Sequence, residues 1–125
     1  MIRRITLADC DAIAKLEARL FSTALDQSRL MALQTNPVFC GFVDLMPDQD
    51  QPQFTLANDL NSYLGGYLLA TIIDDEAEIL SIGVAPDWQR QGVGKRLLQR
   101  FFDYGASRNM VKAVLEVAED NLPAL

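Results

Sequence analysis

The sequence has no histidine, two cysteines and no long apolar run, and each of these features narrows what the chain can do. Without histidine there is no Ser-His or Cys-His catalysis, so a general base must be Asp, Glu, Tyr, Lys or water. The commonest metal ligand is also missing, and we expect no metal. Cys10 and Cys40 lie in apolar periodic segments, which predicts buried, reduced thiols rather than a disulfide or a nucleophile.

Basic charge and membrane signals are scarce as well. No run approaches the ~20 apolar residues that span a bilayer, and the start at residues 1–6 lacks a signal-peptide core. The net charge of −6 argues against general nucleic-acid binding, because nucleic acids attract basic surfaces. We therefore expect a cytoplasmic protein with neither a membrane nor a nucleic-acid partner.

What is present fits one globular domain over residues 1–125, half of which are hydrophobic. Apolar periodicity predicts alternating strands and helices. In chain order, we expect a strand at 3–6, helices at 6–21 and 25–34, strands at 38–43, 64–73 and 77–84, a helix at 93–108 and a strand at 110–117. The segment from Met46 to Asn58, which contains Pro47 and Pro52, is expected to be a mobile loop. This order predicts an α/β (α+β) domain with a mixed sheet.

The most informative stretch joins the strand at 77–84 to the helix that follows it, and residues 89–94 read QRQGVG. A helix that begins in a glycine turn presents unpaired N–H groups and the positive end of its dipole, and glycine lets an anion approach the main chain. Arg90, Lys95 and Arg96 add local positive charge. The glycine spacing excludes both a P-loop and a dinucleotide fingerprint. The turn therefore predicts a phosphate or diphosphate site, against the alternative of a glycine-bearing loop without a ligand.

This stretch resembles the Gln/Arg-x-x-Gly-x-Gly/Ala signature of the GNAT superfamily of acetyl-coenzyme A-dependent N-acetyltransferases. Together with Ile82–Asp87, Leu115–Val117 and Asn121, it is similar to the RimI-type ribosomal-protein-alanine N-acetyltransferases. The resemblance is specific from about residue 76 to 121 and weak from 22 to 63. It implies a GNAT-like mixed, mostly antiparallel central sheet flanked by helices.

The resemblance also implies how acetyl-coenzyme A would bind. The pantetheine arm would lie along the strand before the turn, and the diphosphate would rest on the turn amides. The implied binding residues are Ile82, Gly83, Val84, Gln89, Arg90, Gln91, Gly92, Val93, Gly94, Lys95 and Asn121. For Asn121, a helix N-cap is a competing interpretation.

Acetyl transfer by direct attack of an amine on a thioester needs a group that accepts the proton of the amine. Glu116 matches the general base of the RimI-type pattern. Glu78 is a second candidate, because some superfamily members carry the base on the strand before the glycine turn. A solvated surface glutamate is the alternative for both positions. The pattern continues beyond residue 125 with a tyrosine general acid and the last two strands, so the resemblance implies a domain that lacks its C-terminal segment.

Three functional hypotheses follow from the resemblance. The leading one is an N-acetyltransferase acting on a primary amine, namely a protein N-terminal α-amine of the ribosomal-protein alanine type. The second is a small-molecule amine acetyltransferase. The third is a truncated, non-catalytic coenzyme A-binding module completed by a partner chain. An open strand edge favours pairing with a second copy, so a homodimer belongs to the predicted partners.

Overall fold

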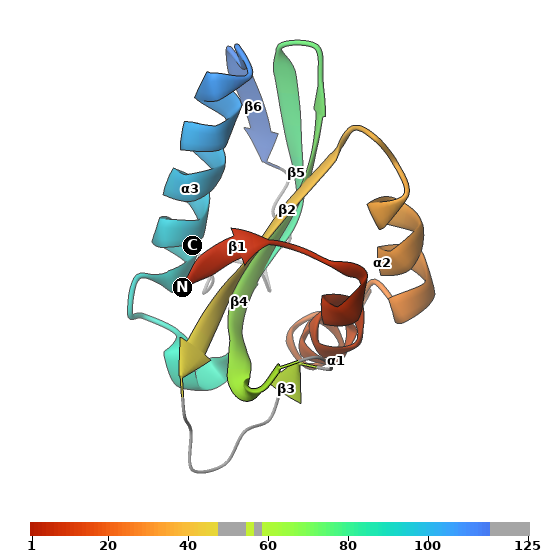
Figure 1. The fold of residues 1–125 in the computed structure, drawn as a ribbon, viewed down its shortest axis with the longest axis vertical. Helices are drawn as coiled ribbons and strands as arrows, with labels where there is room; N and C mark the ends of the chain where they lie inside the picture. Colours follow the sequence, from red (N-terminus) through yellow and green to blue (C-terminus); the bar gives the residue numbers. More distant parts are fainter. Residues whose placement is uncertain (48–54, 57–58, 116–125) are drawn as a thin grey trace.

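The computed structural model describes residues 1–47, 55–56 and 59–115, which form a central sheet with helices on both faces (Figure 1). In chain order, the elements are β1 (Ile2–Arg4), η1 (Leu7–Asp9), α1 (Cys10–Leu20), α2 (Gln27–Gln34), β2 (Phe39–Pro47), β3 (Thr55–Leu56), β4 (Asp59–Ile73), β5 (Glu76–Val84), η2 (Pro86–Trp88), α3 (Val93–Ser107) and β6 (Lys112–Leu115). The elements η1 and η2 are single turns of 3₁₀ helix.

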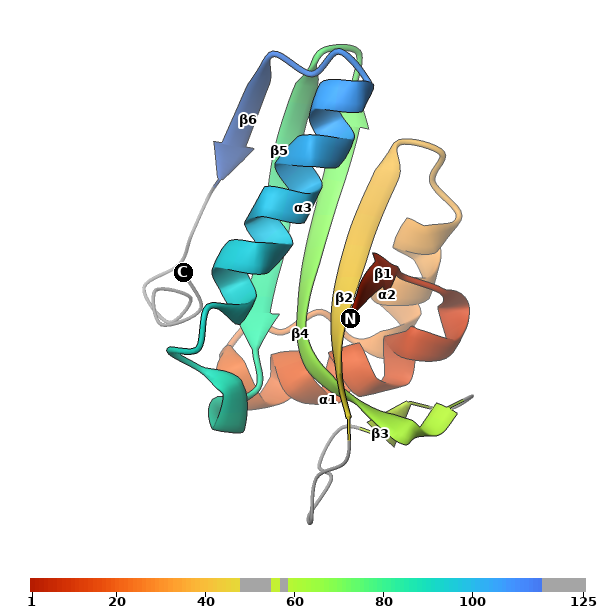
Figure 2. The ribbon, with the colours of Figure 1, turned by 60° about the vertical axis from the view of Figure 1, so that its left-hand side comes forward.

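The sheet has the strand order β1-β2-β4-β5-β6, with β3 paired to β4. All of these pairs are antiparallel except β5 and β6, which run parallel. Strand β6 lies along only the first part of β5, since the last pair joins Ile79 and Leu115 (Figure 2). The expected mixed, mostly antiparallel sheet is confirmed.

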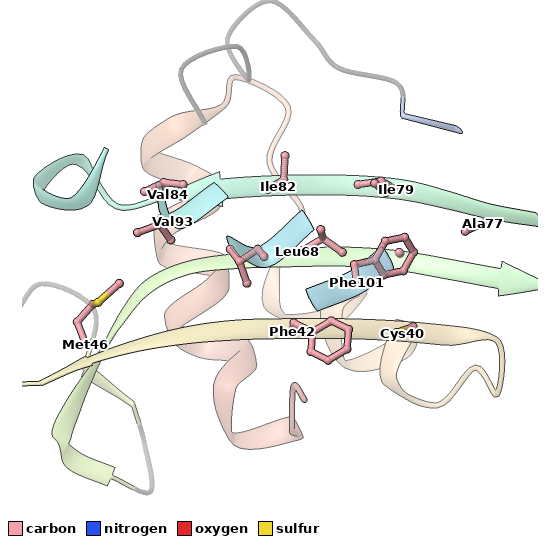
Figure 3. Close-up of a cluster of buried hydrophobic side chains, with 12 residues drawn as sticks. Cys40, Phe42, Met46, Leu68, Ala77, Ile79, Ile82, Val84, Val93 and Phe101 are labelled. Carbon is pink, nitrogen blue, oxygen red and sulfur yellow. The ribbon is translucent and has the colours of Figure 1, made fainter. Parts of the chain in front are cut away.

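Two apolar cores hold the layers together. Helices α1 and α2 pack on one face of the sheet through Ile13, Leu16 and Leu30, which cluster with the β2 and β4 side chains on that face. Helix α3 packs on the other face through Val93, Leu97 and Phe101 (Figure 3). Both cysteines are buried and free, as expected. In the described part of the chain, no helix is both long and apolar enough to cross a membrane.

The expected loop from Met46 to Asn58 is wrong at its described positions. Met46 and Pro47 are the last residues of β2, residues 55–56 form β3, and β4 begins at Asp59 rather than at Leu64. Cross-strand pairing with β2 and β3 overrides the low strand propensity of the polar residues that open β4. Proline is tolerated at the end of β2, where a strand can lose a donor. The rest of the expected loop lies outside the described residues.

A β-bulge at Leu80 changes which side chains of β5 face each helix layer. Register shifts there, because Ala70 of β4 pairs with Ile79 while Leu69 pairs with Ser81. Ile79 belongs to the core under α3, whereas Leu80 and Ser81 both face α1. Beyond the bulge, Ile82 returns to the α3 core. Among the described residues, the bulge thus falls where the pairing of β5 with β6 ends, while its pairing with β4 continues to Val84.

Candidate functional site

The chain leaves β5 through a short, firmly bonded connection. The Ala85 amide donates to the Gly65 carbonyl of β4 at 2.8 Å, which ties the connection to the neighbouring strand. The side-chain amide of Gln89 donates to the Val84 carbonyl at 3.1 Å. Gln89, expected as a binding residue, is therefore engaged in holding the end of the strand, and η2 between these contacts carries the chain into the turn.

Two left-handed residues shape the turn itself. Arg90 has a φ of 64° and Gly92 a φ of 83°, and Gly92 is the N-cap of α3. No side chain caps this helix start. The main-chain N–H groups of residues 91–95 meet no hydrogen-bond acceptor among the described residues, and the first bonded amide is that of Arg96, which donates to the Gly92 carbonyl at 3.0 Å. These free donors surround the positive end of the helix dipole.

The three basic side chains of the turn differ in whether they bind other described residues. Arg96 donates from Nη1 to the Gln91 carbonyl at 3.1 Å and from Nη2 to the buried carboxylate of Asp44 at 3.2 Å. Arg96 therefore fastens the turn to β2. Arg90 and Lys95 are exposed and form no ion pair with a described residue. These two cations carry the local positive charge.

The edge of β5 beside the turn is open as far as the described residues go. Leu80–Val84 has β4 on one side, and on the other side it pairs with no described strand (Figure 2). Ile82, Gly83 and Val84 all lie in this segment, so the structure brings the expected strand residues and the turn amides into one continuous surface. An open strand edge carries main-chain donors and acceptors that a ligand can pair with.

The expected catalytic residues are not assembled in the described part of the chain. Glu78 is exposed and lies between Thr71 of β4 and Val114 of β6, where it lines a hollow of about 540 Å³ at the hairpin end. It precedes Val84 by six residues of strand, roughly 20 Å of chain. The structure therefore does not bring Glu78 to the turn. Glu116 and Asn121 lie outside the described residues.

Sequence reasoning missed a buried polar cluster on the α1 side of β5. Glu17 accepts hydrogen bonds from the hydroxyl groups of Tyr67 and Ser81. A signal was present, because Glu17 occupies a position in the apolar stripe of α1, four residues after Ile13 and three before Leu20. A carboxylate in such a stripe must find donors inside the fold.

Comparison with known proteins assigns the chain to a family. The acetyltransferase (GNAT) family model matches residues 11–125, which include the turn and all of β5. The chain belongs to the GNAT family. The turn of residues 89–94 and the open edge of β5 are thus features of a GNAT chain.

Curated relatives of this GNAT chain fall into two kinds. The [ribosomal protein bS18]-alanine N-acetyltransferase of Escherichia coli strain K12 is 34% identical over 65 residues, 52% of this chain and 44% of that protein. The mycothiol acetyltransferase of Clavibacter michiganensis is 31% identical over 123 residues, 96% of this chain and 38% of that protein. The chain therefore spans less than half the length of either relative.

Solved structures share the fold. The ribosomal-protein-S18-alanine N-acetyltransferase from Escherichia coli has a TM-score of 0.75 at 22% identity, and the match covers 97% of this GNAT chain and 68% of that one. Ard1 from Thermoplasma volcanium has a TM-score of 0.73 at 22% identity, with 97% of this chain and 73% of that one covered. At these identities the likeness supports the fold alone, and it agrees with the sheet described above.

Proposed function

We propose that the chain transfers an acetyl group from acetyl-coenzyme A to a primary amine. One observation carries the proposal: the amides of residues 91–95, which find no partner among the described residues, are continuous with the edge of β5 at Leu80–Val84, which pairs with no described strand. The amides at the start of α3 offer donors to a diphosphate, and the helix dipole favours its negative charge. The strand edge offers main-chain groups to the amides of a pantetheine arm.

The residues of this surface divide the work of binding. The amides of residues 91–95 would hold the diphosphate, with Arg90 and Lys95 adding charge. The main chain of Ile82 and Gly83 would pair with the arm. At Val84 the carbonyl already accepts a bond from Gln89, so Gln89 acts by fixing the strand end. Asn121 remains a further proposed contact.

The bound thioester supplies an activated acyl carbon, and the chain must supply a proton acceptor for the attacking amine. Glu116 is the proposed base, and it directly follows Leu115, which pairs opposite Ile79 beside the bulge. Glu78 remains the second candidate for the general base, because it lies only two residues before the bulge at Leu80. A carboxylate in either role works best when its surroundings raise its pKa toward neutrality.

The proposed acceptor is a protein N-terminal α-amine, as the names of the ribosomal-protein relatives suggest. A small-molecule amine is the second candidate, because the mycothiol acetyltransferase match extends over 96% of this chain. A non-catalytic coenzyme A-binding module remains the third. A cytoplasmic location, the single-domain boundary at residues 1–125 and a homodimer stay predictions.

Calorimetry with acetyl-coenzyme A tests whether the chain binds the proposed acyl donor, and we expect saturable binding. Release of free coenzyme A thiol in the presence of alanine-ended peptides, compared with polyamines, then separates the two acceptor classes. Binding without turnover on either acceptor would favour the non-catalytic module. An absence of binding at millimolar ligand would overturn the proposal.

The base assignment has its own test in Glu116→Gln, with Glu78→Gln as the matched control. We expect Glu116→Gln to lower kcat by about a hundredfold, because general base catalysis contributes on that order, and to leave coenzyme binding intact. Glu78→Gln should change kcat little. The reverse pattern would transfer the role to Glu78.

A further inference from the structure

A buried carboxylate links three separate segments behind the open strand edge. Glu17 of α1 is 2% exposed, and its Oε2 accepts hydrogen bonds from the Tyr67 hydroxyl of β4 and, at 2.7 Å, from the Ser81 hydroxyl of β5. Its Oε1 accepts the main-chain N–H of Leu25 at 3.1 Å, in the connection between α1 and α2. The proposed function assigns no role to any of these groups.

The bulge at Leu80 is what delivers Ser81 to this carboxylate. Strict alternation from Ile79, which faces α3, would turn Ser81 toward α3 as well. The extra residue reverses the alternation, so Ser81 points at Glu17 while Ile82 continues the α3 core. The bond to Glu17 therefore acts on β5 just where its free edge begins.

Tyr67 extends this support to the next residue of the edge. It pairs across the sheet with Gly83, and a Cβ built on Gly83 would lie 2.5 Å from the Tyr67 hydroxyl oxygen. Glycine at position 83 is thus required by the ring that lies against it. The segment from Ser81 to Gly83 is backed on the α1 side by the polar cluster, while its outer edge stays open.

The chemistry of the cluster requires a carboxylate. Burial raises the pKa of Tyr67 well above its usual value, and the adjacent Glu17 raises it further, so this hydroxyl remains a hydrogen-bond donor at physiological pH. The two oxygens of the Glu17 carboxyl group accept from two hydroxyl donors and one amide donor. A glutamine would replace one accepting oxygen with an NH₂ group and leave at least one of these donors unsatisfied.

We propose that Glu17 is a positioning residue for the acyl donor: it holds Ser81 and Tyr67 so that the edge from Leu80 to Val84 keeps the geometry that a pantetheine arm pairs with. This inference rests on the proposed function, because it assigns the edge to that arm. The inference concerns binding of the pantetheine arm only. The turn amides of residues 91–95, which would bind the diphosphate, are positioned by α3 and by the hydrogen bonds of Arg96.

The test compares two probes on the same variants. Coenzyme A contacts both the turn and the strand edge, whereas 3′-phosphoadenosine 5′-diphosphate lacks the pantetheine arm. Glu17→Gln removes an acceptor, and Ser81→Ala removes the β5 donor with a smaller change in shape. We expect both variants to weaken coenzyme A binding by about tenfold, the scale of a lost hydrogen bond to a charged group, with nucleotide affinity within about twofold of wild type.

Ile13→Val is the matched control, because Ile13 lies in the same helix and is fully buried, and the change costs about 1 kcal/mol of stability while it removes none of the hydrogen-bonding groups. It should lower the unfolding midpoint without changing either affinity. Equal weakening of both probes by Glu17→Gln and Ser81→Ala would mean a general structural role and overturn the inference, as would unchanged affinities. If the wild type binds the nucleotide but gains nothing from the arm, the proposed function falls as well.

Discussion

At the scale of single residues, one backbone angle decides the form of the turn. Gly92 has a φ of 83°, a conformation that costs an L-residue with a Cβ about 1 kcal/mol or more. Space is available there, because a Cβ would meet only Arg96 Nη1, at 3.6 Å. Any cost of a substitution at this position therefore comes from the backbone conformation.

Gly92→Ala should lower the free energy of unfolding by about 1 kcal/mol, measured by urea titration, and should weaken coenzyme A binding because the turn amides lose their alignment. Gly92→Asn is the matched control, since asparagine tolerates the left-handed region better than alanine does. Equal losses for both variants would contradict the role of the φ angle.

A second residue makes stability depend on pH. Asp9 is fully buried, and burial pushes its pKa upward, but hydrogen bonds from Arg3 and Thr6 and the charge of Arg3 outweigh that effect and lower the pKa. Arg3 donates to both carboxylate oxygens, at 2.7 and 2.8 Å. Because the folded-state pKa is depressed, this stability is complete above the unfolded-state pKa and is lost as pH falls through the folded value.

Asp9→Asn should therefore cost about 2 kcal/mol at neutral pH, and the gap to wild type should begin to close below about pH 4 and go on closing as pH falls through the lower folded-state pKa. Urea titrations at a series of pH values measure it. Asp11→Asn is the control, because the Asp11–Lys15 pair is exposed and contributes little. A gap that stays constant down to low pH would show that the Asp9 charge does not matter.

Individual residues also show which parts of the site could be predicted from the sequence. The turn could be predicted, since its glycines and the following helix are contiguous in the chain. The cluster of Glu17, Tyr67 and Ser81 could not be assembled, because its hydrogen bonds span 50 and 64 residues of sequence. Arg96 was grouped with the ligand-facing cations for a similar reason, since its partner Asp44 is 52 residues away.

At the scale of elements, the start of α3 is set by its close approach to β4. A Cβ on Gly66 would lie 2.7 Å from Val93 Cγ1, 3.0 Å from the Gly83 carbonyl oxygen and 3.2 Å from Leu97 Cδ1. Glycine at this position lets the first turn of the helix rest directly on the sheet. The height of the turn amides above β5 depends on that contact.

Gly66→Ala should therefore push the helix start away from the sheet and cost about 2 kcal/mol, as overpacking of a tight core does. Urea titration gives the stability, and calorimetry should show weaker coenzyme A binding. Val93→Ala added to Gly66→Ala removes the closest clashing carbon and should restore part of both losses. A double variant no better than the single one would contradict this packing account.

Element boundaries were predicted well where periodicity is local. Helix α3 was expected at 93–108 and occupies Val93–Ser107, and β5 was expected at 77–84 and occupies Glu76–Val84. The first residues of β4 were missed, because asparagine, aspartate and serine disfavour strands and it is pairing with β2 and β3 that places this segment in the sheet. The bulge at Leu80 could not be predicted, because a leucine in an apolar stretch does not indicate a bulge.

At the scale of the whole molecule, the sheet of this GNAT chain carries the proposed binding surface. That surface runs from the start of α3 along the edge of β5 that pairs with no described strand. The described residues proposed to bind the acyl donor lie in the C-terminal half of β5, in the turn after it or at the start of α3. Helix α2 lies on the opposite side of the sheet from α3 and should not respond to the ligand (Figure 1). The central claim is therefore local, and a residue-resolved measurement can test it.

That measurement is amide hydrogen exchange, followed by NMR, with and without acetyl-coenzyme A. We predict slowed exchange at residues 91–95 and along Leu80–Val84, with α2 unchanged. Protection confined to other segments, or bound ligand with no protection in the turn, would contradict it.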